Sequence, residues 1–117
     1  MKEENLILEK SYSFSLRVIK LYKYLTEIKR EYILSKQVLR SGTSIGANTE
    51  EAVGGQSYKD FAAKIGIAYK EARETRYWLR LLKDGQYLEK TFAESIIKDC
   101  EEICRILSRI QITCNNK

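Results

Sequence analysis

The stretch FAAKIGIAYKEARETRYWLRLL, residues 61–82, decides the fold. Apolar or small side chains recur in it at alternating intervals of four and three residues, at Phe61, Ile65, Ala68, Ala72, Thr75, Leu79 and Leu82. Because an α-helix turns once every 3.6 residues, these intervals place all of the side chains on one side of a helix. The stretch therefore predicts a long helix that buries a single face.

Three other stretches show the same spacing, so the sequence predicts four helices, at about residues 6–28, 31–53, 57–83 and 88–113. The predicted core positions outside residues 61–82 are Ile7, Phe14, Val18, Leu21, Leu25, Ile28, Leu34, Val38, Gly42, Ile45, Thr49, Ala52, Phe92, Ile96, Cys100, Ile103, Leu107 and Ile110. Short connections favour antiparallel neighbours. The predicted fold is therefore all-α, an antiparallel up-down-up-down four-helix bundle that forms a single domain over residues 1–117.

Polar breaks separate the predicted helices at residues 26–30, 54–57 and 84–86. The pair Gly54 and Gly55 predicts a left-handed turn that ends the second helix. Ser57 is placed to cap the third helix. Thr91 with Glu94 forms a candidate capping box for the fourth, and the alternative is an earlier start of that helix near Leu88.

Composition excludes several classes of protein. The chain of 117 residues has 21 Lys and Arg against 16 Asp and Glu, a net charge of +5, and it contains neither His nor Pro. A His-based catalytic triad and a His-ligated zinc site are therefore impossible. With 44% hydrophobic and 32% charged residues, the chain is expected to fold without a membrane span.

The three cysteines predict reduced thiols rather than a disulfide framework. Their number is odd, and the N-terminal residues lack the basic and apolar regions of a signal peptide, so we expect a cytoplasmic protein. Cys100 and Cys104 lie one helical turn apart, but a metal site would need two more ligands. Cys100 falls on the predicted core face and is interpreted as a small buried hydrophobe. No cofactor and no metal are expected.

A second set of apolar side chains lies beside the predicted core faces. Its members are Leu8, Tyr12, Leu16, Ile19, Tyr22, Ala63, Ile67, Trp78, Leu81, Ala93, Ile97 and Cys104. One interpretation is a broad core face, and the other is an interface between subunits, since an exposed apolar surface favours association. The candidate interface residues are Ile19, Tyr22, Trp78, Leu81 and Ile97.

Residues 39–48, LRSGTSIGAN, are unusually rich in small and hydroxyl side chains for a helix. Small residues allow two helices to approach closely, and Ser or Asn can hydrogen-bond across a contact or back to a carbonyl group. No Lys follows the second glycine, which argues against a phosphate-binding loop. The motif residues Arg40, Ser41, Gly42, Ser44, Asn48 and Glu51 are therefore interpreted as structural.

A line of basic residues recurs at helical spacing in the third helix, at Arg73, Arg76, Arg80 and Lys83. Tyr69 and Tyr77 lie close to this line, and basic side chains interleaved with aromatic rings suit a nucleic acid. Arg17 and Lys20 of the first helix are further candidates. The alternative is a solvated flank beside the core, because Glu71 and Glu74 reduce the positive charge.

Taken together, residues 38–48, 57–61 and 71–75 resemble the bacterial four-helix-bundle proteins first noticed as products of intervening sequences in large-subunit ribosomal RNA genes, some of which were misnamed ribosomal proteins. The accessory variability determinant of diversity-generating retroelements is similar to this family. The resemblance covers about residues 8–112. It implies an antiparallel bundle and a homopentamer and, in the retroelement branch, a basic surface for nucleic acid and a reverse transcriptase.

The sequence leaves two functions open. The first is a non-enzymatic homo-oligomer that binds RNA or structured DNA through a basic surface. The alternative is a structural or protein-interaction module with no role in nucleic-acid binding. An enzyme is disfavoured, because sequential carboxylates such as Glu50 and Glu51 point about 100° apart on a helix.

Overall fold

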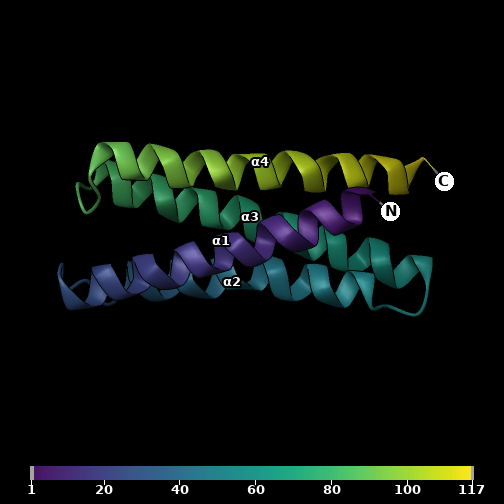
Figure 1. Ribbon diagram of the computed structural model, residues 1–117, viewed down its shortest axis with the longest axis horizontal. Coiled ribbons are helices and arrows are strands. Elements are labelled where there is room, and N and C mark those ends of the chain that lie inside the picture. The colour runs from purple at the N-terminus through teal and green to yellow at the C-terminus, as the bar shows by residue number, and fades with distance from the viewer. Residues whose placement is uncertain (1, 117) are drawn as a thin grey trace.

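Four long helices make up the fold of this chain. The computed structural model describes residues 2–116, and in it the helices are α1 (Lys2–Glu27), α2 (Leu34–Val53), α3 (Tyr58–Asp84) and α4 (Lys90–Asn115). Successive helices run in opposite directions along the bundle, and both chain ends lie at the same end (Figure 1). No strand occurs in residues 2–116, so the all-α antiparallel bundle is confirmed. None of these helices is long and apolar enough to span a membrane.

The core contains nearly all of the side chains that the spacing predicts. Val18, Ile45, Ile65 and Leu107 are completely buried, as are most other predicted positions. Leu34, Phe61 and Phe92 are only partly buried against the core, and Ile28 is 67% exposed. α1 ends at Glu27, so Ile28 leaves the helical face on which the spacing had placed it.

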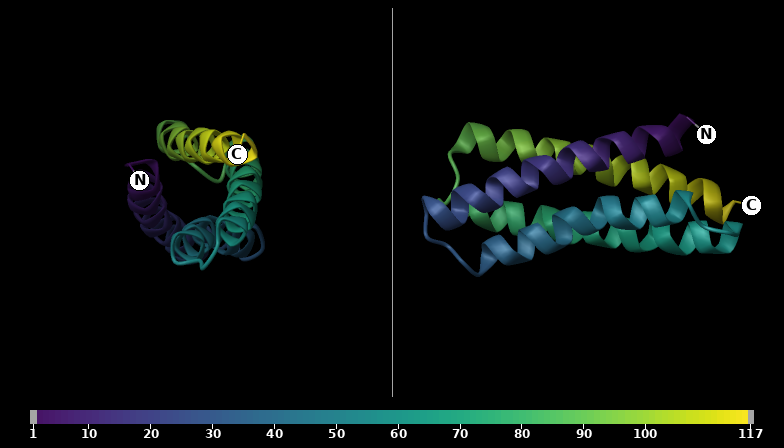
Figure 2. Two further views of the ribbon diagram at one scale, coloured as in Figure 1. Left: turned by 90° about the vertical axis from the view of Figure 1, so that its right-hand side faces the viewer. Right: turned by 60° about the horizontal axis from the view of Figure 1, so that its bottom comes forward.

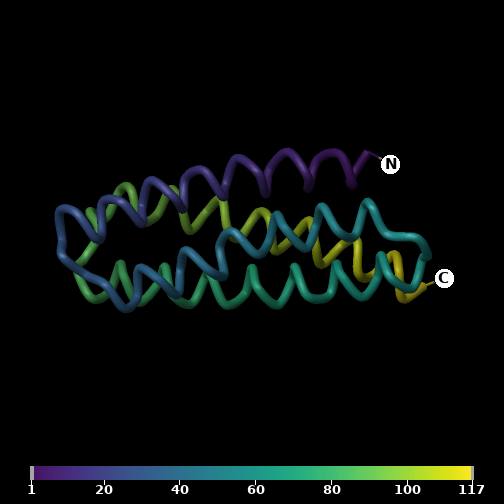
Figure 3. Tube along the Cα trace, turned by 90° about the horizontal axis from the view of Figure 1, so that it is seen from below, coloured from purple at the N-terminus to yellow at the C-terminus, as the bar shows by residue number. Residues whose placement is uncertain are grey.

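The helices follow one another around the bundle in chain order, so each packs against its neighbours in sequence (Figure 2). α4 closes the circle against α1, and this seam has the least contact of the four. Figures 1 and 3 show why: α1 runs obliquely across α4, so the two helices separate toward their ends. α1 and α3 lie diagonally across the bundle, and their backbones do not come close to each other.

The residues that adopt a left-handed backbone conformation in the turns are not the ones that the sequence predicts. Gly54 has a φ of −82°, so the left-handed turn predicted for Gly54 and Gly55 is wrong. The positive φ angles fall instead on Arg30, at 57°, and Gln86, at 66°. In the described chain no glycine has a positive φ, which means that backbone hydrogen bonds and packing set these turns rather than glycine.

Side-chain oxygens cap three of the helices. The Ser57 side chain accepts a hydrogen bond from the Asp60 amide, which confirms the predicted cap of α3. The predicted Thr91 cap is wrong, because Glu89 precedes α4 and accepts from the Thr91 and Phe92 amides. Glu31 accepts from three amides at the start of α2, those of Ile33, Leu34 and Ser35.

Candidate nucleic-acid interface

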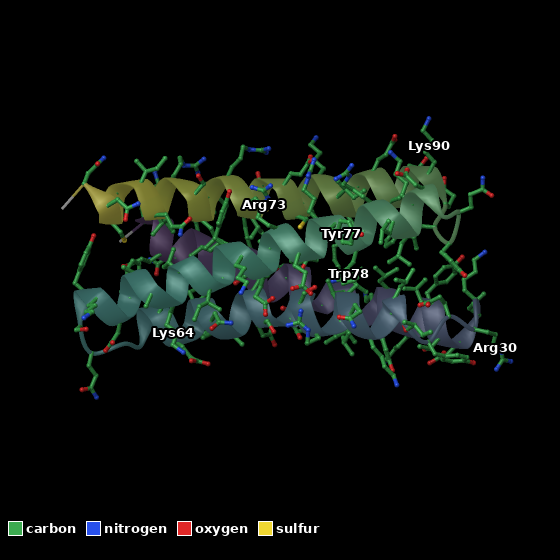
Figure 4. All side chains as sticks on the ribbon, turned by 180° about the vertical axis from the view of Figure 1, so that it is seen from behind. Arg30, Lys64, Arg73, Tyr77, Trp78 and Lys90 are labelled. Atoms are coloured by element: carbon green, nitrogen blue, oxygen red, sulfur yellow. The ribbon has the colours of Figure 1, made fainter. Side chains whose placement is uncertain are left out.

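The basic line of α3 lies on the side of that helix that faces α4. Arg73 extends from α3 toward α4 (Figure 4), where its guanidinium donates to the Tyr69 hydroxyl over 3.1 Å and lies over the Tyr69 ring. Arg76 pairs with Glu101 of α4, with 2.9 Å between Nε and Oε2. Lys83 lies 3.9 Å from Glu94, also of α4. Arg80 is exposed and forms no hydrogen bond or ion pair with residues 2–116.

The structure separates Arg17 and Lys20 from this line. Arg17 pairs with Asp99, donates to Ser95 over 3.3 Å and lies over the Phe92 ring, so it is held in the α1–α4 seam. Lys20 is exposed beside the same seam. These two residues therefore belong to the α1–α4 seam, whereas the α3 line lies at the α3–α4 seam.

α4 contributes a basic residue that the sequence interpretation missed. Arg105 is exposed, makes no hydrogen bond or ion pair within the described residues, and lines a hollow together with Arg73 and Arg76. It lies one turn after Glu101, the partner of Arg76, and this spacing on α4 is the signal that could have identified it. We call Arg73, Arg76, Arg80, Lys83 and Arg105 the α3–α4 basic surface.

Two thiols lie beneath this surface. Cys100 is fully buried, as predicted, and its thiol lies 3.4 Å from the Ala72 carbonyl oxygen. Hydrogen bonding to Cys104 and burial both raise the pKa of the Cys100 thiol. The pKa of Cys104 is lowered, first by the hydrogen bond with Cys100 and then by the charges of Arg73 and Arg76. The described residues contain no cluster of Cys, Asp and Glu suited to a metal ion.

The small-residue motif packs helices together. A β-carbon on Gly42 would lie 2.9 Å from both γ-carbons of Val18, so α2 meets α1 closely there, as predicted. On the other side of α2, the buried hydroxyls of Ser41 and Thr75 are 2.8 Å apart. These two contacts fix α2 between α1 and α3.

The remaining motif residues make contacts within α2 or with α3. Ser44 donates to the Arg40 carbonyl over 2.7 Å, and Asn48 donates to the Ser44 carbonyl over 2.8 Å. Arg40 pairs with both Glu71 and Glu74, while Glu51 pairs with Lys64 of α3 over 2.7 Å. These contacts favour a structural role for the motif.

The candidate interface residues lie in different environments. Ile19 and Leu81 are each 38% exposed, on the diagonal helices α1 and α3. Tyr22 is half-buried, and Ile97 packs partly against the core. Trp78 extends from α3 toward α2 (Figure 4) and donates to Glu74 over 2.9 Å.

Further apolar side chains extend the exposed surface of α1. Tyr12 is 65% exposed and Leu16 is 49% exposed, so this helix presents a continuous apolar strip with Ile19. Ala93, by contrast, is fully buried and belongs to the core rather than to a second face. The second apolar set therefore divides by burial: Ala93 is in the core, Trp78, Ile97 and Cys104 pack partly against it, and the exposed members lie on α1 and α3.

Comparison with known proteins agrees with this geometry. A crystal structure of a protein of unknown function from the S23 ribosomal protein family, from Bacteroides thetaiotaomicron VPI-5482, matches with a TM-score of 0.91 and 47% sequence identity. The match covers 93% of this chain and 97% of that one. No curated protein matches the chain. Residues 3–109 match the model of the 23S rRNA-intervening sequence protein family, and the chain belongs to that family.

Proposed function

We propose that this chain is a non-enzymatic, homo-oligomeric cytoplasmic protein that binds nucleic acid through the α3–α4 basic surface. One observation carries the proposal. The side chains of Arg73, Arg80 and Arg105 are exposed, and none of them forms an ion pair with a carboxylate of residues 2–116. Arg40, on the α2 side of α3, has two carboxylate partners instead. Unpaired guanidinium groups on one side of the bundle are available to phosphate groups.

Separate apolar surfaces on α1 and α3 support the oligomer. Because these helices are diagonal in the bundle, the α1 strip of one subunit can pack against the exposed apolar side chains of α3 on the next. Contacts between two different surfaces of this kind close into rings when the rotation allows it. The homopentamer that the family resemblance implies is such a ring.

An oligomer would repeat the basic surface once per subunit. A few cations bind phosphate weakly, but linked copies on one rigid scaffold raise the overall affinity through effective concentration. Binding of this type depends on phosphate rather than base identity, so it should tolerate many sequences and weaken steeply with salt.

Binding of fluorescent RNA and structured DNA across a salt series tests the proposal. We expect affinity to fall with rising salt, and we expect Arg73→Glu combined with Arg80→Glu to abolish binding. The control is Lys29→Glu combined with Lys36→Glu, which makes the same change of charge at exposed residues outside α3 and α4. Failure of the wild type to bind at low salt, or equal binding by the two double variants, would favour a structural or protein-interaction module.

A further inference from the structure

A hollow on the α3–α4 basic surface gathers side chains from both helices. It has a volume of about 410 Å³ and is lined by Tyr69, Arg73, Arg76, Glu101, Cys104, Arg105 and Ser108. Three guanidinium groups and two hydroxyl groups therefore surround it, against the single carboxylate of Glu101. The hollow lined by Glu9, Lys10, Arg17, Asp99 and Glu102, by contrast, has no such excess of positive charge.

The guanidinium groups keep donors free for a ligand. Arg76 contacts Glu101 through Nε, so its two terminal nitrogens take no part in that ion pair. Arg73 bonds the neutral Tyr69 hydroxyl through one terminal nitrogen, and Arg105 forms no hydrogen bond or ion pair within residues 2–116. Planar guanidinium groups with free N–H donors bind phosphate oxygens in pairs.

The Cys104 thiol supplies independent support for this convergence. It lines the hollow, and its pKa is lowered first by the hydrogen bond with Cys100 and then by the charges of Arg73 and Arg76, while burial and the Glu101 charge raise it. Two guanidinium groups close enough to stabilise one thiolate can stabilise another anion at the same place.

We propose that this hollow binds the terminal phosphomonoester of a nucleic-acid strand, in an inference that rests on the proposed nucleic-acid function. A terminal phosphate carries a charge of about −1.5 to −2 and three free oxygens. An internal phosphodiester carries one charge and is bonded to a nucleotide on each side. It therefore suits a line of cations along the nucleic-acid strand better than a cluster of cations around one point. Arg73, Arg76 and Arg105 converge from two helices, so they match the terminal group.

Two RNA oligonucleotides of one sequence, with and without a 5′-phosphate, test the proposal directly. We expect the phosphorylated strand to bind at least about tenfold more tightly to the wild type, since three guanidinium groups contact the added charge. Arg105→Gln should remove the difference between the strands. Arg109→Gln is the matched control, because Arg109 lies one turn further along α4, outside the hollow, and should preserve the difference.

The possible results separate this inference from the function on which it rests. Salt-dependent binding that is unchanged by a 5′-phosphate and by a 3′-phosphate overturns the terminal-phosphate site and leaves nucleic-acid binding intact. Loss of preference in Arg109→Gln as well as in Arg105→Gln also overturns the site, because the preference would then reflect overall charge. A 3′-phosphate tested in the same way shows which end of the strand the hollow accepts.

Alkylation of Cys104 provides a second measurement that needs no oligonucleotide. In a Cys114→Ser variant, Cys104 is the accessible thiol, since Cys100 is fully buried. We expect adenosine monophosphate, but not adenosine, to slow the reaction with neutral iodoacetamide several-fold, and Arg105→Gln to remove the protection. Equal alkylation rates in adenosine monophosphate and in adenosine would overturn the proposal. A Cys104 thiol that does not react even without a nucleotide would also overturn it, because the hollow would then be closed to ligands.

Discussion

At the scale of single residues, the contact of Gly42 with Val18 sets the distance between α1 and α2. Val18 is completely buried and β-branched, so its side chain has little freedom to move aside. Gly46 occupies a looser position one turn later, where a β-carbon would lie 3.4 Å from the Ser15 hydroxyl oxygen. The two glycines of residues 39–48 therefore tolerate substitution differently.

Replacing Gly42 with Leu should destabilise the bundle by about 1–3 kcal/mol, because the new side chain overpacks the contact with Val18. Urea unfolding followed by circular dichroism measures the change. Gly46→Ala is the control and should be neutral or stabilising by up to about 1 kcal/mol, since alanine favours helix and the added carbon meets ordinary contacts. An unchanged stability for Gly42→Leu would mean that α1 and α2 adjust freely.

At the scale of helices, an acidic residue precedes both α2 and α4 and caps the first amides of each. Glu31 and Glu89 accept hydrogen bonds from the first amides of these helices, where the helix dipole also favours negative charge. The hydrogen bonds from Thr91 and Phe92 lower the pKa of Glu89 from its ordinary value of 4.5. The folded state thus stabilises the charged form of this carboxylate.

The lowered pKa of Glu89 makes the stability of the bundle depend on pH. Because the folded-state pKa of Glu89 is depressed, its contribution is complete above pH 4.5 and is lost as the pH falls through the folded-state value. We expect Glu89→Gln to lower the melting temperature at neutral pH and to reduce the further loss below pH 4.5. Glu94→Gln, one turn later in α4, is the control; an equal effect of both variants would contradict a specific cap.

The helices and their buried faces could be predicted because burial follows the helical period of the sequence itself. Ile28 could not be placed, since its environment depends on where α1 ends, and that end depends on Arg30 adopting a left-handed conformation. Spacing also identified Arg73 and Arg76. It could not show that Arg105 joins them, because this depends on the rotation and axial position of α4 against α3.

At the scale of the whole molecule, the exposed apolar strip of α1 bears on assembly. We expect light scattering to give a multiple of 13.7 kDa, and Leu16→Asp to reduce it to the monomer, because a charge would enter the proposed contact. Ile112→Asp is the control, since Ile112 is 57% exposed near the end of α4 and outside the strip. A wild type of 13.7 kDa at micromolar concentration would refute the oligomer.

The limited contact between α1 and α4 affects how the bundle folds and how it unfolds locally. The other three helix contacts join neighbours in sequence, so they form with little loss of chain entropy, whereas closing α1 onto α4 brings distant segments together. Ion pairs such as Lys10 with Glu102 and Arg109 with Glu3 line this seam, and salt screens exposed pairs. Amide hydrogen exchange should therefore be faster in α1 than in α3 and should accelerate selectively in α1 as the salt concentration rises.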